Sequence, residues 1–208
     1  MRTTIKLLDR RRLGRGLVLG ALLTGVLASS VSAATTQVDV NDSRRFLPGS
    51  VTQTVGGRVH WQASGSDDHS VTSDQGLFGT GTAAAGVNFT RTFSAGTFPY
   101  HCEEHATQGM RGTVRVAPQV LSAPAGLPFT VKWAAAGTNT GTRFDVQYRV
   151  GSGAWKAWKT TTSAKSAVFG ARSAPVRVVR GKSYSFRVTS KIGTARSSLS
   201  PVKTFRAR

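Results

Sequence analysis

The 208-residue chain has a single cysteine, Cys102. One thiol excludes an internal disulfide, and an exposed lone thiol outside the cell would be open to oxidation or mispairing. A bound ligand or a buried, inert position would protect it. The residues around Cys102 have to decide between these two interpretations.

Acidic residues are also scarce, with nine Asp and Glu against 28 Lys and Arg. Residues 34–117 hold seven of the nine acids and six Arg, which leaves a net charge of −1. Residues 118–208 hold 16 Lys and Arg but one acid, Asp145, which leaves +15. So sharp a change in charge indicates a domain boundary.

The chain lacks an apolar run long enough to span a bilayer, which takes about 20 residues. The longest candidate, Leu17–Ala28, is 12 residues long and follows Arg10, Arg11, Arg12 and Arg15. A charged segment, a short apolar run and small residues at Val31–Ala33 are typical of a signal peptide. We therefore predict that residues 1–33 are a signal peptide and that the mature chain is exported, with no transmembrane segment. Sec and twin-arginine export both remain open, and the absence of a cysteine here argues against a lipid anchor.

No segment shows the periodicity of an amphipathic helix. Apolar and polar residues alternate in short runs instead, as at Val38–Val40, Val59–Trp61 and Val114–Val116, and Gly, Asp and Ser separate them. Residues 87–93 form another such run, with Arg91 as the exception on its apolar face. The segment 117–124, with Pro118 and Pro124, reads as a linker that runs into a new first strand. The predicted fold class is all-β, with one sandwich over residues 35–117 and a second over 122–208.

The segment Tyr100–Met110 carries the strongest chemical signal, because Cys102, His105 and Met110 follow one another with the spacing Cys-x2-His-x4-Met. A second histidine, His69, lies 33 residues before Cys102 in a loop-like region. Two imidazoles, a thiolate and a thioether are the ligand set of a trigonal copper site with a weak axial Met. A structural zinc site would not select Met.

With these residues in place, segment 35–117 resembles the plastocyanin/azurin family of cupredoxins, which are Greek-key β-sandwiches that carry electrons. Three further stretches share the family pattern: Phe46-x-Pro48-x2-Val51, Gly57-x-Val59-x-Trp61 and Gly109-Met110-x-Gly112-x-Val114-x-Val116. The resemblance implies one copper ion, cycling between Cu(I) and Cu(II). Its ligands would be His69, Cys102, His105 and Met110.

Two positions depart from the family pattern. Glu104 stands where members usually have Pro before the second ligand histidine, and Ser70 stands where Asn often follows the first. These differences bear on the stiffness of the ligand loop and on hydrogen bonding to the thiolate. Neither removes a ligand.

The remaining two histidines are predicted to be structural, because in an extended strand His101 faces away from Cys102, and His60 alternates out of register with its apolar neighbours.

Four histidines in total cannot supply the additional clusters of a multicopper oxidase or a nitrite reductase. A dinuclear copper site would need a second Cys. We therefore expect a type 1 blue-copper electron carrier and not an enzyme. Two alternatives stay open: a copper storage or delivery protein of the envelope, and a cell-surface scaffold in which copper is incidental.

Segment 122–208 resembles a fibronectin type III module, an immunoglobulin-like sandwich, through Trp133, Phe144-x-Val146-x-Tyr148 and Tyr184-x-Phe186. It has no His or Cys and one carboxylate, so it lacks a catalytic group pair. Its charge favours an anionic partner such as an acidic envelope polymer or lipid headgroups, and export disfavours nucleic acid. A solvated basic surface without a ligand is the alternative. The redox partner protein is not identified by the sequence.

Overall fold

The computed structural model of the chain describes residues 34–121, 127–171 and 176–208. The predicted signal peptide lies outside these residues, so it stays a prediction. The described residues form β-strands, turns and one three-residue 3-10 helix, which confirms the predicted all-β fold class. None of these residues forms a helix that is long and apolar enough to cross a membrane.

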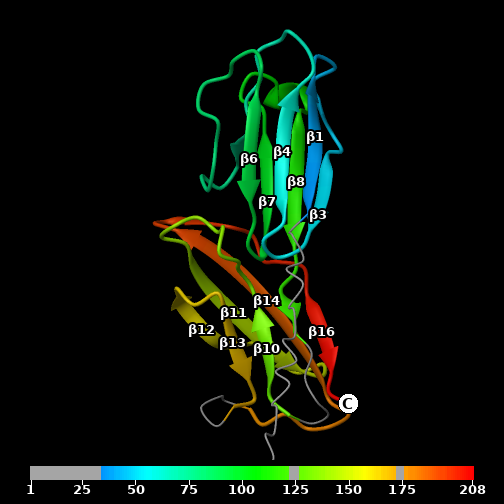
Figure 1. Cartoon of the computed structure of the whole chain (residues 1–208), viewed down its shortest axis with the longest axis vertical. Coiled ribbons are helices and arrows are strands. Elements are labelled where there is room, and N and C mark those ends of the chain that lie inside the picture. The colour runs from blue at the N-terminus through cyan, green and yellow to red at the C-terminus, as the bar shows by residue number, and fades with distance from the viewer. Residues whose placement is uncertain (1–33, 122–126, 172–175) are drawn as a thin grey trace, which may run out of the picture. The chain divides into compact units, whose positions relative to one another are not determined.

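The first group of strands makes two four-stranded sheets (Figure 1). One sheet has the order β2-β1-β4-β6, from Arg45–Leu47, Thr35–Asn41, Arg58–Ala63 and Asn88–Thr92. The other has the order β3-β8-β7-β5, from Ser50–Gln53, Arg111–Val116, Gly96–His101 and Thr72–Ser73. β1 runs parallel to β4 and β3 runs parallel to β8, whereas β7 and β8 are antiparallel neighbours.

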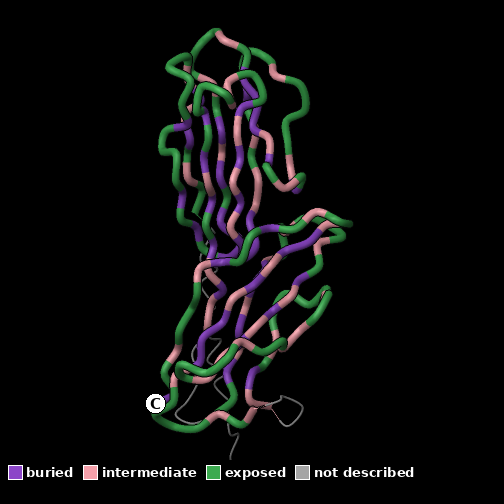
Figure 2. Tube along the Cα trace, turned by 180° about the vertical axis from the view of Figure 1, so that it is seen from behind, coloured by how far each residue is buried: buried purple, intermediate pink, exposed green. Residues whose placement is uncertain are grey.

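Apolar and polar residues alternate along these strands, so the apolar side chains of both sheets form a core between them. Val38 and Val40 of β1, and Val114 and Val116 of β8, are fully buried while the residues between them are more exposed. Buried and more exposed positions alternate along the trace in the same way (Figure 2). Trp61 fills the centre and packs edge-on against Tyr100, with ring centroids 5.3 Å apart. Such aromatic contacts bury large apolar area and fix the spacing of the two sheets.

Arg91, the polar exception in β6, is half-buried against aromatic rings. Its guanidinium lies 4.8 Å from the centroid of Phe78, and burial lowers its pKa to about 10. The apolar face predicted for residues 87–93 therefore continues through Arg91, because its planar group stacks like an aromatic residue.

The second group of strands forms a three-stranded and a five-stranded sheet. The first has the order β13-β10-β9, from Ser166–Phe169, Phe129–Lys132 and Gln119–Val120. The second has the order β12-β11-β14-β15, from Lys156–Thr162, Arg143–Val150, Ser183–Ile192 and Ala195–Arg196, and β16 (Lys203–Arg206) pairs with β14. Trp133, Phe169 and Phe186 lie fully buried in its core. A second β-sandwich is thus present, as the sequence predicts; the domain limits themselves stay a prediction.

Candidate metal centre

Two antiparallel strands and one loop bring the predicted ligands together. β7 ends at His101 and β8 begins at Arg111, so Cys102 and Met110 stand at the two ends of the loop that connects them. His105 lies within that loop, immediately before the 3-10 helix η1 (Ala106–Gln108). His69 comes from the segment between β4 and β5, where its backbone forms an isolated bridge with Ala84.

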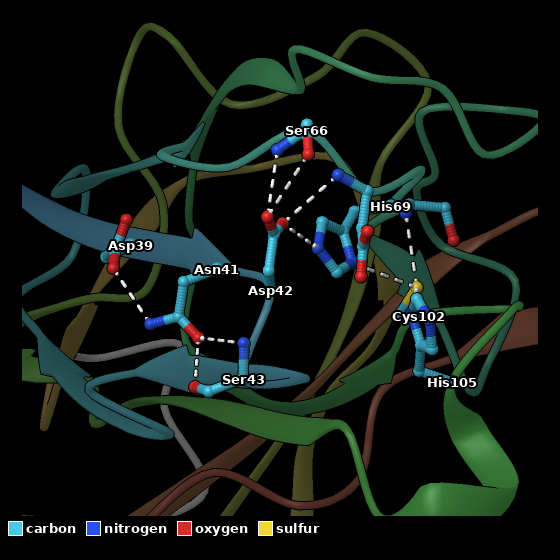
Figure 3. A network of polar contacts seen from close by, with 10 residues as sticks. Asp39, Asn41, Asp42, Ser43, Ser66, His69, Cys102 and His105 are labelled. Carbon is cyan, nitrogen blue, oxygen red and sulfur yellow. Dashed lines mark hydrogen bonds and ion pairs between the residues drawn. The ribbon is translucent and has the colours of Figure 1, made fainter.

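The side chains of His69, Cys102 and His105 converge on one point (Figure 3). Nδ1 of His69 lies 3.8 Å and Nδ1 of His105 lies 3.5 Å from Sγ of Cys102, and all three donor atoms are within 4.8 Å of one another. Metal–thiolate bonds of about 2.3 Å and metal–imidazole bonds of about 2.0–2.1 Å place S and N roughly 3.6–3.8 Å apart at trigonal or tetrahedral angles. The observed separations therefore fit a single metal ion.

Burial differs among the three donors. His69 and Cys102 are fully buried, whereas His105 is partly exposed. Of these three candidate ligands, His105 is the one whose side chain reaches the surface.

Met110 is fully buried, and its backbone is tied to both neighbouring ligands. Its carbonyl accepts a hydrogen bond from the N–H of Cys102 at 3.1 Å, and its N–H donates to the carbonyl of His105 at 3.1 Å. These two bonds hold the fourth predicted ligand in the same loop. Its role as the axial ligand stays a prediction.

The loop keeps its shape without the proline that the family usually has at the position of Glu104. The N–H groups of Gln108 and Met110 both donate to the carbonyl of His105, and Gly109 ends η1 in the left-handed region at φ 86°. A left-handed residue that closes a helical turn is normally glycine. Backbone hydrogen bonds and Gly109 thus restrain the segment between Cys102 and Met110.

Ser70 links the two ligand segments. Its backbone N–H donates to Sγ of Cys102 at 3.4 Å, and its hydroxyl accepts the N–H of Glu103 at 2.9 Å. Asn is usual at this position in the family. Ser70 nevertheless provides a backbone donor to the sulfur of Cys102 and a hydroxyl acceptor for the N–H of Glu103, the residue after Cys102. The sequence shows that Ser70 departs from the family pattern, but these contacts become visible only in the structure.

The two other histidines lie outside this cluster. Nε2 of His60 is 2.9 Å from Oδ1 of Asn88, and Nδ1 of His101 is 2.5 Å from Oδ1 of Asp74. Each therefore has a polar partner of its own. A carboxylate that sequence reasoning missed, Asp42, lies with Oδ1 3.6 Å from Nε2 of His69.

Comparison with known proteins finds a family model that matches part of the chain. Residues 32–117 match the sequence model of the copper binding proteins of the plastocyanin/azurin family. This segment is similar to a cupredoxin domain. It contains all four predicted ligands, and its donor set of two imidazoles and one thiolate fits copper.

Solved structures similar to this segment include a plastocyanin, a purple cupredoxin and an amicyanin. Oxidized plastocyanin from Dryopteris crassirhizoma is 22% identical with a TM-score of 0.34, over 39% of this chain and 99% of its own. A purple cupredoxin from Nitrosopumilus maritimus is 23% identical with a TM-score of 0.35, over 39% and 98%. A mutant amicyanin in its reduced Cu(I) form is 29% identical with a TM-score of 0.32, over 42% and 86%. Among curated proteins, no sequence matches this chain.

Proposed function

We propose that the chain is an exported type 1 blue-copper protein that carries single electrons. The observation that carries this proposal is the convergence of one thiolate and two imidazoles, two of the three fully buried, in a domain of a copper-binding family. His69, Cys102 and His105 would hold the ion, and Met110 would be the weak axial ligand. Copper supplies a one-electron couple when bound there.

Fast electron transfer requires that the metal-binding side chains move little when the oxidation state of the metal changes. Ser70 holds the thiolate of Cys102, and the backbone bonds around Met110 hold the ligand loop. A site whose donors are fixed before the ion arrives needs little rearrangement when the charge changes. The partly exposed imidazole of His105 then provides the contact with a redox partner protein, while buried Cys102 and His69 exclude water.

Cyclic voltammetry of the copper-loaded chain tests this proposal. A reversible one-electron couple, with rapid self-exchange measured by NMR line broadening, is expected. A storage or delivery protein would instead pass Cu(I) to an acceptor apoprotein and show no reversible couple. A scaffold would keep its cell-surface binding after Cys102→Ala, and its copper would be dispensable.

For the second sandwich, we propose a fibronectin type III-like module that binds an acidic polymer of the cell envelope. Residues paired across antiparallel strands share a face, and the register of β11, β14 and β16 places five cations on the same face of the sheet. These are Arg143, Arg149, Arg187, Lys191 and Arg206.

The one carboxylate on that face is already neutralised. Oδ1 of Asp145 lies 2.8 Å from Nζ of Lys191, and its Oδ2 lies 3.4 Å from Nη1 of Arg196. Trp155 lies beside two of the other cations, with its ring centroid 4.2 Å from the guanidinium carbon of Arg187 and 4.9 Å from that of Arg149. A stacked aromatic fixes the orientation of both guanidinium groups, so they present a cationic face to an anionic chain.

Sedimentation of the full chain with polygalacturonate tests this surface. The double variant Arg149→Gln/Arg187→Gln should bind several-fold more weakly, and binding should fade as salt exceeds about 0.15 M. Lys132→Gln/Lys165→Gln serves as the control, because it removes the same two positive charges elsewhere. Lys132 lies in β10 of the three-stranded sheet, and Lys165 directly precedes β13 of that sheet. Equal losses in both variants would mean that net charge alone acts. Binding confined to phosphatidylglycerol vesicles would replace the polymer with a lipid surface.

A further inference from the structure

His69 has one ring nitrogen whose hydrogen bond is missing. Because Nδ1 faces the sulfur of Cys102, a neutral imidazole ligand carries its proton on Nε2. That Nε2 is buried and has no hydrogen-bond partner among the described residues. A buried donor without an acceptor is energetically unfavourable, because it has lost its hydrogen bonds to water, so an acceptor is expected close by.

The nearest carboxylate to this nitrogen is held in a fitted cradle. Asp42, which directly follows β1, accepts the backbone N–H of Ser66 through Oδ2 at 3.0 Å and that of Asp67 through Oδ1 at 3.1 Å. Its Oδ1 lies 3.6 Å from Nε2 of His69 (Figure 3). A shift of a few tenths of an ångström would complete the hydrogen bond.

Gly65 makes room for this carboxylate. A Cβ atom built at Gly65 would collide with Cγ and both oxygens of Asp42. The segment that leads to His69 thus binds one side of the carboxylate by two N–H bonds and approaches it closely where residue 65 has no side chain, while the Asp42 side chain stays 41% exposed. An Asp side chain is ionised at neutral pH, so the group that these N–H bonds hold is a carboxylate.

We propose that Asp42 is a positioning residue for the metal ligand His69, whose Nε2–H it accepts. The contact fixes the tautomer that leaves Nδ1 free and sets the orientation of the ring, as carboxylates next to ligand histidines do. The negative charge also favours the higher oxidation state of a metal held by His69. This inference deepens the proposed function and rests on it for the identity of the metal.

Asp42→Asn in the full chain is the test, because the amide keeps the shape and removes the charge. Asp39→Asn is the matched control: it removes a carboxylate from β1, three residues before Asp42, where Asp39 bonds with Asn41. Gly65→Ala is the second variant, since it displaces the carboxylate without removing it. Three quantities are measured: solvent exchange of the His69 Nε2–H by ¹⁵N NMR in the metal-free protein, the Zn²⁺ dissociation constant, and the reduction potential with copper.

Asp42→Asn and Gly65→Ala should speed exchange of the Nε2–H and weaken Zn²⁺ binding about 10–100-fold. Asp42→Asn should also raise the reduction potential, and Asp39→Asn should resemble wild type in all three. Identical values for Asp42→Asn and Asp39→Asn would overturn the inference and leave Asp42 a loop-holding residue. A wild-type chain that binds neither metal would overturn the proposed function, while the Nε2–H exchange would still decide the role of Asp42.

Discussion

The backbone N–H of Ser70 donates to Sγ of Cys102 over 3.4 Å, which joins the loop of His69 to the end of β7. A hydrogen bond to a thiolate withdraws charge from the sulfur and so tunes the metal it holds. The hydroxyl of the same residue binds the N–H of Glu103. One small buried residue thus connects two segments that each supply a ligand.

Removing the hydroxyl separates these two roles of Ser70. Ser70→Ala should lower the free energy of unfolding of the metal-free chain by about 0.5–1.5 kcal/mol, the usual net value of a hydrogen bond. Because the backbone N–H remains, the colour of the copper-loaded protein should persist. Urea denaturation and visible spectroscopy check the two outcomes. A colourless variant of wild-type stability would mean that the hydroxyl acts directly at the metal.

Gly109 is expected to be a stability determinant of the ligand loop. Its φ of 86° is left-handed, and a Cβ there would meet nothing within 4 Å, so backbone strain is the main cost of a side chain. Gly109→Ala should destabilise the protein by about 1–2 kcal/mol. Gly109→Asn should cost less, because Asn tolerates this region. Thermal unfolding of both variants measures the difference, and equal losses would point to a lost contact instead.

Asp145 should make the second sandwich sensitive to acid. Burial alone would raise its pKa, but Lys191 and the N–H of Thr161 outweigh burial, so the pKa falls below 3.8. A lowered pKa in the folded state stabilises the protein above the unfolded pKa, and this contribution is lost as pH falls through the folded value. Asp145→Asn should therefore reduce stability at pH 7 and flatten its dependence on pH below about 4. Urea denaturation from pH 2 to 7 tests this, and an unchanged profile in the variant would contradict it.

Much of this fold and site follows from local sequence. The alternation at Val38–Val40 and Val59–Trp61 predicts the strands, and the spacing of Cys102, His105 and Met110 indicates the chemistry, because both are short-range patterns. Asp42 could not be found in this way. It precedes His69 by 27 residues in an ordinary turn segment, and the parallel pairing of β1 with β4 is what brings the two segments together. The role of Ser70 likewise depends on a contact with Cys102, 32 residues away.

The central claim is tested most directly by the visible absorption spectrum of the chain loaded with one equivalent of Cu(II). We predict an intense blue colour from charge transfer between the Cys102 thiolate and copper, lost in Cys102→Ser because a hydroxyl is a harder donor that stays protonated. Met110→Leu should stay blue with a shifted reduction potential, since the axial ligand is weak. A colourless wild-type protein, or one that takes up stoichiometric zinc in preference to copper, would contradict the account.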